Sequence, residues 1–489
     1  MNRKIISLIF FILTILFLGL GTLSRSQTQQ RQDDYQLNLQ NESVDISPEL
    51  NFVIGLGVFR SVLIDFIWMR ASKLQQEKRF YEIVQLYDMI GKLQPHNSMI
   101  WAYSAWNMAY NISVELPPGL ERWRWVQNGI KRITEHGLHY NPKDRLLYKE
   151  IAWIYSHKIS KNLDDSHLLY KIKLAETITD AFRPFSASAK AIEEALKSKD
   201  SQLVTQAKQV ISRLKETFCL DYEFMLNLEK NDDFGPLDWR IGETHAIYWT
   251  KLGLAKGTYG SKPIELERIM YQSMQYLLRK GTIVYIEATD TLPANITQWP
   301  DYKQVFPMNR MFIKQINLFQ QSNTSVTGVR SAYFYFLKEA LEILVFAGQN
   351  SEAEKLFKLA NQTMPGILSG RNAEEHIKHN LVQRVKEMSG DQFSALVSSL
   401  FLQHYWWLGN ANTQKANAML IYAQQLWKIN AKENPYAERS TNNDLQQIKR
   451  NVLITLFEKK MFHPKVLKRI YAEASVNKLL NSSKVPKKN

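Results

Sequence analysis

The chain has 489 residues, a length that suits two or three ordinary domains or one extended array of stacked helices. With 45% hydrophobic residues it can bury a large core, and its 20 glycines and 15 prolines are too few for the many turns of an all-β fold. The formal net charge is +15, but basic and acidic residues are interspersed, which disfavours a nucleic-acid-binding protein and suits one that faces an anionic membrane or wall.

Residues 1–24 are predicted to form an N-terminal membrane anchor. Residues 5–23 are an unbroken apolar run of about the 20 residues needed to cross a bilayer. Arg3 and Lys4 precede this run, which by the positive-inside rule keeps the N-terminus in the cytoplasm and sends the rest of the chain outward. A cleaved signal peptide is the alternative, but the nearest match to a small-residue cleavage site lies inside the apolar run. We therefore expect a single-pass membrane protein with most of its chain outside the cytoplasm.

Residues 25–47 are polar and rich in Gln, Asn and Ser, which predicts a flexible stalk. Residues 50–69 form a second apolar stretch, which carries Arg60 and Asp65. Because of these charges we interpret this stretch as a buried helix of the globular part rather than a second membrane span. A helix that lies on the membrane surface is the alternative.

Residues 48–231 are predicted to form helical repeats, with strong helical patterning from near residue 48 and breaks at turns between successive helices. Residues 164–231 are expected to contain at least two further helices with poor repeat character. Pro95 and Pro142 follow predicted helices, and each is expected to end a helix pair, because proline cannot continue a helix. The expected helices are residues 64–76, 80–93, 98–113, 120–136 and 146–159.

Residues 232–310 interrupt this pattern and are predicted to be an irregular insert with helices. A tight turn at residues 234–236 precedes a helix that starts near Glu243, and residues 263–279 form a second amphipathic helix. Residues 281–307 are a long irregular stretch with one short strand. Stretches of that length usually carry function or are inserted between repeats.

The most regular helix pair lies in residues 311–435. Residues 333–346 supply an aromatic-rich helix, and a glycine turn leads into a second helix with two small residues and one aromatic residue on a single face. A proline closes this second helix. The defining positions are Ala353, Phe357, Ala360 and Pro365. Residues 393–408 and 413–429 are expected to form a further pair, and residues 436–489 to contribute C-terminal helices and a basic tail.

The spacing of these four residues resembles the second half of a tetratricopeptide repeat, and Pro95 and Pro142 match its closing proline. The resemblance implies an all-α fold, an α-solenoid of imperfect helix pairs with a nonrepeat insert, preceded by one transmembrane helix. Residues 105–113, 121–126 and 237–249 are also similar to uncharacterised membrane-anchored repeat proteins from planctomycete and verrucomicrobial bacteria. This second resemblance implies a protein of the bacterial cell envelope and brings no known activity.

A cluster of ionisable and aromatic residues opens the predicted helix of the insert. It comprises Asp238, Trp239, Arg240, Glu243, His245 and Trp249. One interpretation is a binding pocket with aromatic walls, an arginine fork for an anionic group, and a histidine or carboxylate that orients it. The favoured interpretation is a helix start, with Asp238 or Thr244 as the cap and Arg240 paired with a neighbouring carboxylate.

A second cluster, Asn107, Asn111, Trp123 and Arg124, lies in the first helix pairs. Tryptophan and arginine are favoured in protein-binding grooves as well as in helix packing. Trp123 and Trp125 are two positions apart, so a helix turns them to different faces. Core packing is the favoured interpretation of this cluster, and a binding groove is the alternative.

No residue pattern calls for a metal, a cofactor or catalysis. His136 with His139 and His376 with His379 have a spacing that a helix could use for two metal ligands, but no third ligand is near and HExxH is absent. Cys219 is the sole cysteine, which excludes an intramolecular disulfide and a cysteine-based zinc site. No P-loop, GxGxxG, GxSxG or kinase motif is present.

These features predict a membrane-anchored envelope scaffold that binds a protein partner through a helical-repeat surface, without catalysis. Repeats provide an extended surface rather than a sheltered cavity, which favours this hypothesis. The alternative is a small-ligand or glycan receptor, or a hydrolase, built on residues 238–249. Neither a nucleic-acid partner nor a cofactor is expected.

Overall fold

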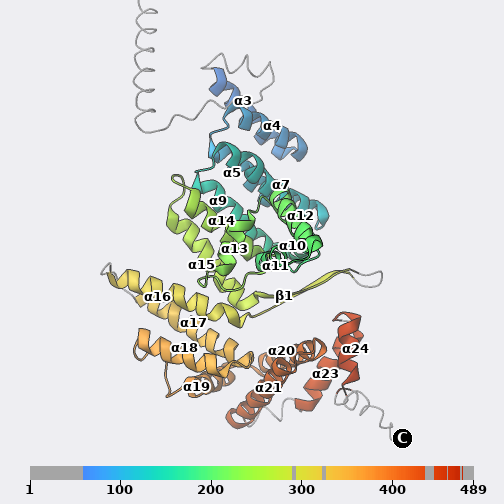
Figure 1. The fold of residues 1–489 in the computed structure, drawn as a ribbon, viewed down its shortest axis with the longest axis vertical. Helices are drawn as coiled ribbons and strands as arrows, with labels where there is room; N and C mark the ends of the chain where they lie inside the picture. Colours follow the sequence, from blue (N-terminus) through green and yellow to red (C-terminus); the bar gives the residue numbers. More distant parts are fainter. Residues whose placement is uncertain are drawn as a thin grey trace, which may run out of the picture. The chain divides into compact units, whose positions relative to one another are not determined.

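The protein is mostly helical, in agreement with the predicted all-α class (Figure 1). The chain divides into two compact units, Met1–Gln94 and Pro95–Asn489. The computed structural model describes residues 59–288, 293–321, 327–434, 445–459, 461–473 and residue 476.

The described part of the first unit is a pair of helices, α3 (Phe59–Gln76) and α4 (Phe80–Leu93). The second helix has the predicted bounds, and the first begins earlier than residue 64. Ala71 and Tyr87 are buried between the two helices, and the ring centroids of Trp68 and Tyr87 lie 5.6 Å apart. An aromatic pair at this distance adds to the apolar area that holds the helices together.

Residues 50–69 were predicted to form a buried helix, but one face of α3 is exposed. Residues 50–58 lie outside the described part of the chain. From Phe59 on, α4 covers only one face of α3, while Val62, Phe66 and Met69 are 62%, 62% and 65% exposed. These three residues are spaced by four and three positions and therefore form one exposed apolar stripe. The prediction is wrong for this face.

The predicted membrane anchor, residues 5–23, and the predicted stalk, residues 25–47, lie outside the described residues. Among the residues that the structure describes, no helix combines the length and the apolar character needed to span a bilayer. The membrane anchor therefore stays a prediction.

The second unit begins with three continuous helices, termed rods below, and each of them changes from α-helical to π-helical geometry along its length. The first rod is α5 (Ser98–Trp106), η1 (Asn107–Ile112) and α6 (Ser113–Glu115). The second is α7 (Leu120–Lys131), η2 (Arg132–Gly137) and α8 (Leu138–Tyr140). The third is α9 (Arg145–Trp153) and η3 (Ile154–Ile159). The rods follow the predicted helices closely, whereas the π segments, which are frequent at functional sites, were not predicted.

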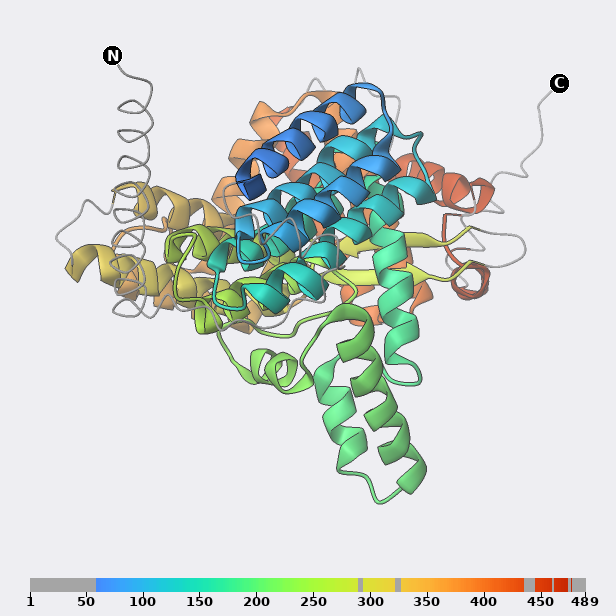
Figure 2. The same cartoon turned by 90° about the horizontal axis from the view of Figure 1, so that it is seen from above.

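The next four helices are α10 (His167–Phe182), α11 (Ala189–Leu196), α12 (Ser201–Phe218) and α13 (Tyr222–Lys230). Helices α11 and α12 pack against each other and form the green pair that projects from the neighbouring helices of the second unit in Figure 2. The chain leaves α12 through Cys219, which adopts a left-handed conformation with a φ angle of 54°.

Helix α14 (Gly242–Lys256) lies in the core of the second unit, between α9 and α15 (Pro263–Lys280). Both helices were predicted, but the patterning did not predict that α14 is buried on nearly all sides. Gly253 makes this possible, because a Cβ atom there would lie 2.6 Å from Cβ of Tyr148 and 2.8 Å from Cδ2 of Leu266. The glycine lets α14 approach α9 and α15 at the same time.

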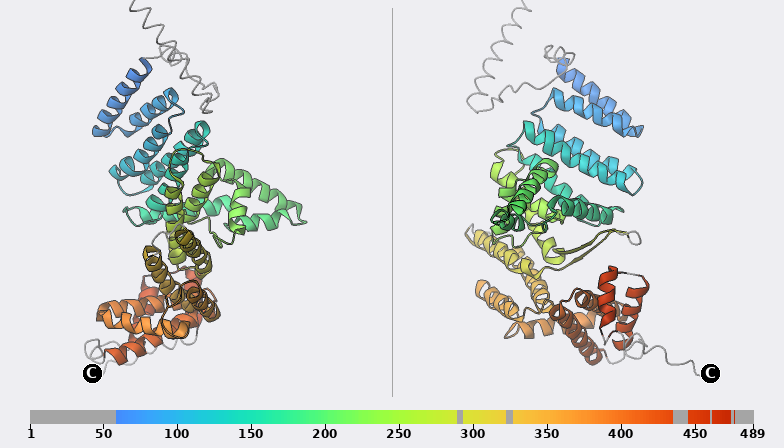
Figure 3. Two further views of the ribbon diagram at one scale, coloured as in Figure 1. Left: turned by 90° about the vertical axis from the view of Figure 1, so that its left-hand side faces the viewer. Right: turned by 45° about the vertical axis from the view of Figure 1, so that its right-hand side comes forward.

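A β-hairpin follows α15, where one short strand was predicted. Strands β1 (Thr282–Ile286) and β2 (Asn295–Trp299) pair antiparallel, with Thr282 opposite Trp299 (Figure 3). A single strand would leave its backbone donors and acceptors without partners, and the second strand supplies them. The short 3-10 helix η4 (Tyr302–Gln304) then leads into the remaining helices.

The rest of the second unit is helical. Its described helices are α16 (Val305–Gln321), α17 (Thr327–Phe346), α18 (Asn350–Thr363), α19 (Ala373–Glu387), α20 (Gly390–Gly409), α21 (Thr413–Glu433), α23 (Leu445–Glu458) and α24 (Pro464–Ala472). The pairs α17–α18 and α20–α21 match the two predicted pairs. Ala353, Phe357 and Ala360 are buried, and Pro365 follows the end of α18, as the repeat pattern requires.

Candidate functional site

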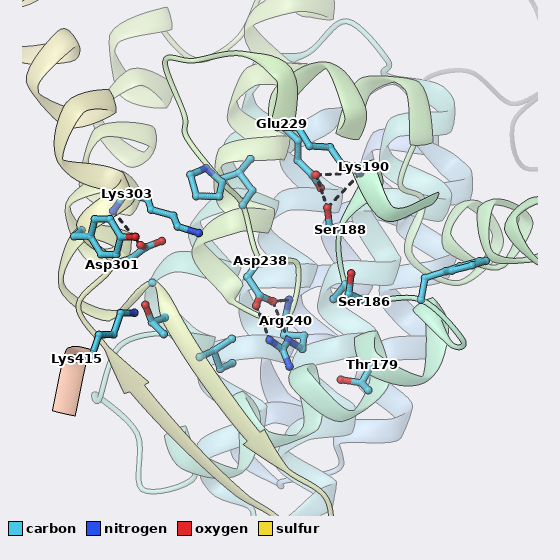
Figure 4. Close-up of a pocket in the computed structure, with 18 residues that line it drawn as sticks. Thr179, Ser186, Ser188, Lys190, Glu229, Asp238, Arg240, Asp301, Lys303 and Lys415 are labelled. Atoms are coloured by element: carbon cyan, nitrogen blue, oxygen red, sulfur yellow. Dashed lines mark hydrogen bonds and ion pairs between the residues drawn. The ribbon is translucent and has the colours of Figure 1, made fainter. Parts of the chain in front are cut away.

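A pocket of about 490 Å³ opens where segments that are distant in the sequence meet. Its walls come from the connection between α10 and α11, the turn before α14, the start of β1 and the segment at η4 (Figure 4). Lys415 of α21 completes one side. We term this cavity the hairpin pocket, because the first residues of the hairpin form part of its wall.

Asp238 and Arg240 lie on the wall of the hairpin pocket and bind each other. Nε and Nη2 of Arg240 donate to the two carboxylate oxygens of Asp238 at 2.9 and 2.6 Å. Both side chains are 26% exposed. Burial alone would lower the pKa of Arg240, but the hydrogen bonds and charge of Asp238 outweigh it and raise that pKa. The predicted arginine–carboxylate pair is present, so the arginine fork holds Asp238.

Trp239 lies behind the pocket and is fully buried. Its Nε1 donates to Oε1 of Glu229 at 2.6 Å. Glu229 also accepts hydrogen bonds of 2.6 to 3.1 Å from the hydroxyl of Ser188 and from the backbone N–H groups of Ala189 and Lys190. These N–H groups open α11 and have no partner within that helix, so the carboxylate satisfies them. Sequence patterning missed Glu229 because its partners at the start of α11 lie some 40 positions away.

The other three residues of the predicted cluster point into the core. Glu243, His245 and Trp249 are 1%, 0% and 2% exposed. The Nε2 atom of His245 lies 2.8 Å from the carbonyl oxygen of Trp239, and its ring stacks on Tyr155 with centroids 4.6 Å apart. Burial raises the pKa of Glu243 to about 8 and lowers that of His245 to about 4. The six predicted residues therefore do not share one pocket, and only Asp238 and Arg240 reach the cavity.

The predicted cap of this helix is wrong. Helix α14 starts at Gly242, its N-cap residue is Ile241, and no side chain caps it. The carboxylate of Asp238 accepts hydrogen bonds from Arg240, with Oδ1 accepting from its backbone N–H and from Nε, and Oδ2 from Nη2. The hydroxyl of Thr244 donates instead to the backbone carbonyl of Asp238 at 2.7 Å and ties the turn to the first helical residues.

We expect Arg240→Ala to lower the free energy of unfolding by about 1–2 kcal/mol, because it leaves Asp238 as a largely buried carboxylate without its cation. Arg240→Lys should recover only part of this loss, since an ammonium cannot form the bidentate fork. The midpoint of urea unfolding measures both effects. Unchanged midpoints in both variants would contradict a structural role for the pair.

A second cavity, of about 600 Å³, runs between α5, α9 and α15, and most of its lining is apolar or aromatic. Met99, Tyr103 and Trp106 of α5 are 63%, 43% and 38% exposed. Trp153 of α9 and Ile269 of α15 lie on its other sides. We term this cavity the aromatic groove. Large apolar side chains gathered in one exposed groove are typical of an interaction site.

Aromatic rings continue from this groove along the π segments. The ring centroids of Trp106 and Tyr110 lie 6.1 Å apart, and those of Tyr110 and His157 lie 5.8 Å apart. His157 in turn stacks on Trp153, with centroids 4.4 Å apart and an interplanar angle of 15°. Lys161 places its Nζ atom 5.7 Å from the ring centroid of Trp153. The rings thus form a continuous track across η1 and η3.

Two residues of the second predicted cluster, Asn107 and Trp123, pack into the core, as the favoured interpretation predicts. Asn107 is fully buried and accepts a hydrogen bond of 2.8 Å from Nδ2 of Asn111. Trp123 is buried and stacks on Tyr170, with ring centroids 6.1 Å apart. Arg124 is exposed and pairs with Glu121. None of these four residues lines the aromatic groove, but Trp106, which directly precedes Asn107 in the sequence, does.

A buried ion cluster around Asp164 was not predicted. Lys158 Nζ lies 2.5 Å from Oδ2 of Asp164, and Arg122 Nη1 lies 3.1 Å from Oδ1, with all three side chains at most 9% exposed. Tyr170 donates its hydroxyl to the same carboxylate at 3.2 Å. Burial raises the pKa of Asp164, but the hydrogen bonds from Lys158 and from the backbone N–H of Ser166, with the charges of Lys158 and Arg122, outweigh it and hold that pKa below its ordinary value. The cluster joins η3 to α7 and α10.

The first histidine of each predicted pair is engaged in packing or hydrogen bonds. His136 stacks on Trp101, and His376 is hydrogen-bonded with Ser369 and Asn380. Within the described ranges, no group of three His, Cys, Asp or Glu side chains has a geometry that could hold a metal ion.

Within the described residues the hairpin pocket and the aromatic groove are larger than the cavity of about 330 Å³ that lies beside the Asp164 ion cluster, and they offer more room to a ligand or partner. A polar wall with several charged groups characterises the first, and exposed rings characterise the second. Comparison of the sequence with protein-family models and with curated proteins found no match. The function of the chain must therefore be argued from these two surfaces.

Proposed function

We propose that the chain is a membrane-anchored scaffold of the bacterial cell envelope, built as an α-solenoid, which binds a protein partner on its helical-repeat surface. The aromatic groove carries this proposal, because it is a largely apolar and aromatic surface with exposed rings between α5, α9 and α15, and such a surface is typical of an interaction site. Interface cores are enriched in Met, Tyr, Trp and Arg. The groove presents all four types, as Met99, Tyr103, Trp106, Trp153 and Arg268.

The charges of the groove indicate which kind of segment fits it. Lys149 lies 3.4 Å from both Glu150 and Glu265, so these three charges largely satisfy one another. Arg268 is exposed, and Lys161 lies over Trp153. Within the residues described, neither of these two cations forms an ion pair. A segment with apolar anchors and acidic neighbours complements both the rings and the cations, and an acidic amphipathic helix has this pattern.

The competing hypothesis is a small-ligand or glycan receptor, or a hydrolase, built on residues 238–249. A general acid or base must come within hydrogen-bond reach of its substrate. Glu243 and His245, the two residues best suited to that role, are 1% and 0% exposed. Their burial favours the scaffold over a hydrolase at this cluster.

A photoreactive amino acid at position 99 tests the groove in membranes that contain the full-length chain. We expect it to crosslink to one partner protein through an acidic, apolar peptide that mass spectrometry can identify. Trp106→Ala combined with Trp153→Ala should reduce the crosslink by about tenfold or more, since buried aromatic anchors contribute about 2 kcal/mol or more each. Arg268→Glu should weaken it as well, through repulsion of the acidic segment.

Matched positions on α17 serve as controls. Tyr335 is 69% exposed, so the photoreactive residue at position 335 is equally accessible and should give no comparable product. Arg330 is likewise exposed, and Arg330→Glu should leave the crosslink at position 99 unchanged. Equal yields at positions 99 and 335, or a product that contains glycan or lipid instead of protein, would contradict the proposed function.

A further inference from the structure

The walls of the hairpin pocket carry more positive than negative charge, with four cationic side chains against three carboxylates. Two of the carboxylates are engaged. Asp238 is held by Arg240, and Glu229 accepts the donors at the start of α11. Three lysines on these walls form no ion pair within the described part of the chain. They are Lys190, Lys303 and Lys415.

Two of these lysines lie on the same side of the pocket. Figure 4 shows Lys303 and Lys415 opposite the Asp238–Arg240 pair, with their ammonium groups turned toward the cavity. The Nζ atom of Lys415 lies 4.2 Å from the ring centroid of Trp407. Such a ring attracts a cation but does not neutralise it.

The surroundings of Lys415 favour an added anion. Burial lowers the pKa of Lys415, and the charge of Asp301 offsets this effect only in part. Asp301 already accepts the backbone N–H of Lys303 at 3.0 Å. Asp301 is close enough to act on Lys415 through its charge, but the two form no ion pair in the described part of the chain. A partly buried ammonium that lacks an ion pair is stabilised when an anion binds beside it, because the ion is then desolvated with a partner.

The apolar residues in the lining of the hairpin pocket indicate what the rest of the ligand would be. Phe185, Leu237 and Ile283 contribute apolar surface. The volume of about 490 Å³ lies within the range of about 300–1,000 Å³ found for small-molecule sites. The pocket therefore combines cationic groups and apolar surface in one cavity.

We propose that the hairpin pocket binds a small organic anion, whose phosphate or carboxylate group lies beside Lys303 and Lys415 and whose apolar part contacts Leu237 and Ile283. This site is independent of the proposed protein partner, because the hairpin pocket and the aromatic groove share no lining residue. Trp106→Ala should accordingly leave anion binding unchanged.

Three probes of similar size test the proposal by isothermal titration of the full-length chain in a non-ionic detergent. They are 1-naphthyl phosphate, 1-naphthoate and the uncharged 1-naphthalenemethanol. We expect at least one of the two anions to bind at a single site, at least about tenfold more tightly than the neutral probe, and more weakly as salt is added. The anion that binds more tightly shows whether the site prefers a phosphate or a carboxylate group.

Variants of the lysines locate the site. Lys303→Met should weaken anion binding by about tenfold, and so should Lys415→Met, while Lys415→Arg should retain most of it. Lys355→Met is the matched control, because Lys355 also lies over an aromatic ring, 4.9 Å from the centroid of Phe306, but outside the pocket. Since Lys303 is exposed, its variant should keep the wild-type melting temperature even where Lys415→Met does not.

Three results would overturn the proposal. The first is that neither anion binds the wild-type chain saturably at millimolar concentration. The second is that the neutral probe binds as tightly as the anions. The third is that Lys303→Met and Lys355→Met have equal effects on anion binding.

Discussion

Trp239→Ala is expected to lower the free energy of unfolding by about 3–5 kcal/mol. The side chain is fully buried, and its ring centroid lies 5.8 Å from that of His245 and 5.9 Å from that of Tyr248. Its indole N–H donates to Glu229. The substitution therefore creates a large cavity and also removes a hydrogen-bond donor from a buried carboxylate, and both effects destabilise the fold.

Trp106→Ala is the matched control for this prediction. The same side chain is removed, but Trp106 is 38% exposed, so the loss should be about 1 kcal/mol or less. Far-UV circular dichroism follows urea unfolding without relying on tryptophan fluorescence. A much larger shift of the midpoint for Trp239→Ala is expected. Equal shifts would contradict the burial of Trp239 and would reopen the cluster at residues 238–249 as an accessible site.

The helices could be predicted because their signals are local. In α4 the periodic apolar residues have charged neighbours, and the helix runs from Phe80 to Leu93 as its pattern indicates. In α18 the small residues Ala353 and Ala360 are buried where the spacing places them. Turns, caps and periodicity all lie within a few residues of each other, so one sequence is enough to recognise them.

The burial of α14 on nearly all sides could not be predicted in the same way. Its segment contains Glu243, Thr244 and His245, which are polar residues in sequence but are all buried in the structure. Periodicity assigns polar residues to the surface, and it has no means to recognise a helix that is covered on nearly all sides. The polar cluster therefore resembled a site, although most of it belongs to the core.

The candidate sites depend on contacts between distant segments. Lys415 reaches the hairpin pocket from α21, more than a hundred positions after Lys303, and no local spacing links the two residues. The aromatic groove likewise combines Trp106 of α5 with Trp153 of α9 and Arg268 of α15. Only the packing of the helices brings these side chains together, and sequence patterning does not contain that information.

The pH dependence of stability that arises from Glu243 tests whether the core around α14 is closed to water. Burial raises the pKa of Glu243 from 4.5 to about 8, against the opposing effects of the Ser160 hydroxyl and the charges of Lys171 and Lys161. Between these pH values the folded protein keeps a proton that the unfolded chain has released. The stability contributed by the neutral carboxyl group is therefore complete below pH 4.5 and is lost as the pH rises to about 8.

Other titratable groups near Glu243 act outside this window or in the opposite direction. Burial lowers the pKa of Lys171 from 10.5 to about 8, so Lys171 changes stability only above pH 8. The pKa of Tyr276 is raised and lies higher still. Burial lowers the pKa of His245 from 6.5 to about 4, so its contribution is complete above pH 6.5 and is lost as the pH falls to about 4.

Glu243→Gln should remove the loss of stability that the wild-type protein suffers as the pH rises. Since one pKa unit corresponds to about 1.4 kcal/mol, the difference in unfolding free energy should move in favour of the variant by roughly 3–5 kcal/mol between pH 5 and pH 8. Burying the amide that Glu243→Gln introduces costs the variant free energy, but this cost does not depend on pH and therefore does not affect the change between pH 5 and pH 8. The contribution of His245 cancels too, because both proteins contain it.

The test measures the urea unfolding midpoints of the wild type and of Glu243→Gln at steps of half a pH unit across this range. The difference between the two proteins, plotted against pH, gives the slope. His245→Gln is the control of opposite sign, because the wild type should lose stability relative to that variant as the pH falls below 6.5. Parallel curves for the wild type and Glu243→Gln would mean that Glu243 ionises in the folded state at its ordinary pKa. Water would then have to reach the carboxyl group, and α14 could not be the dry central helix that its burial indicates.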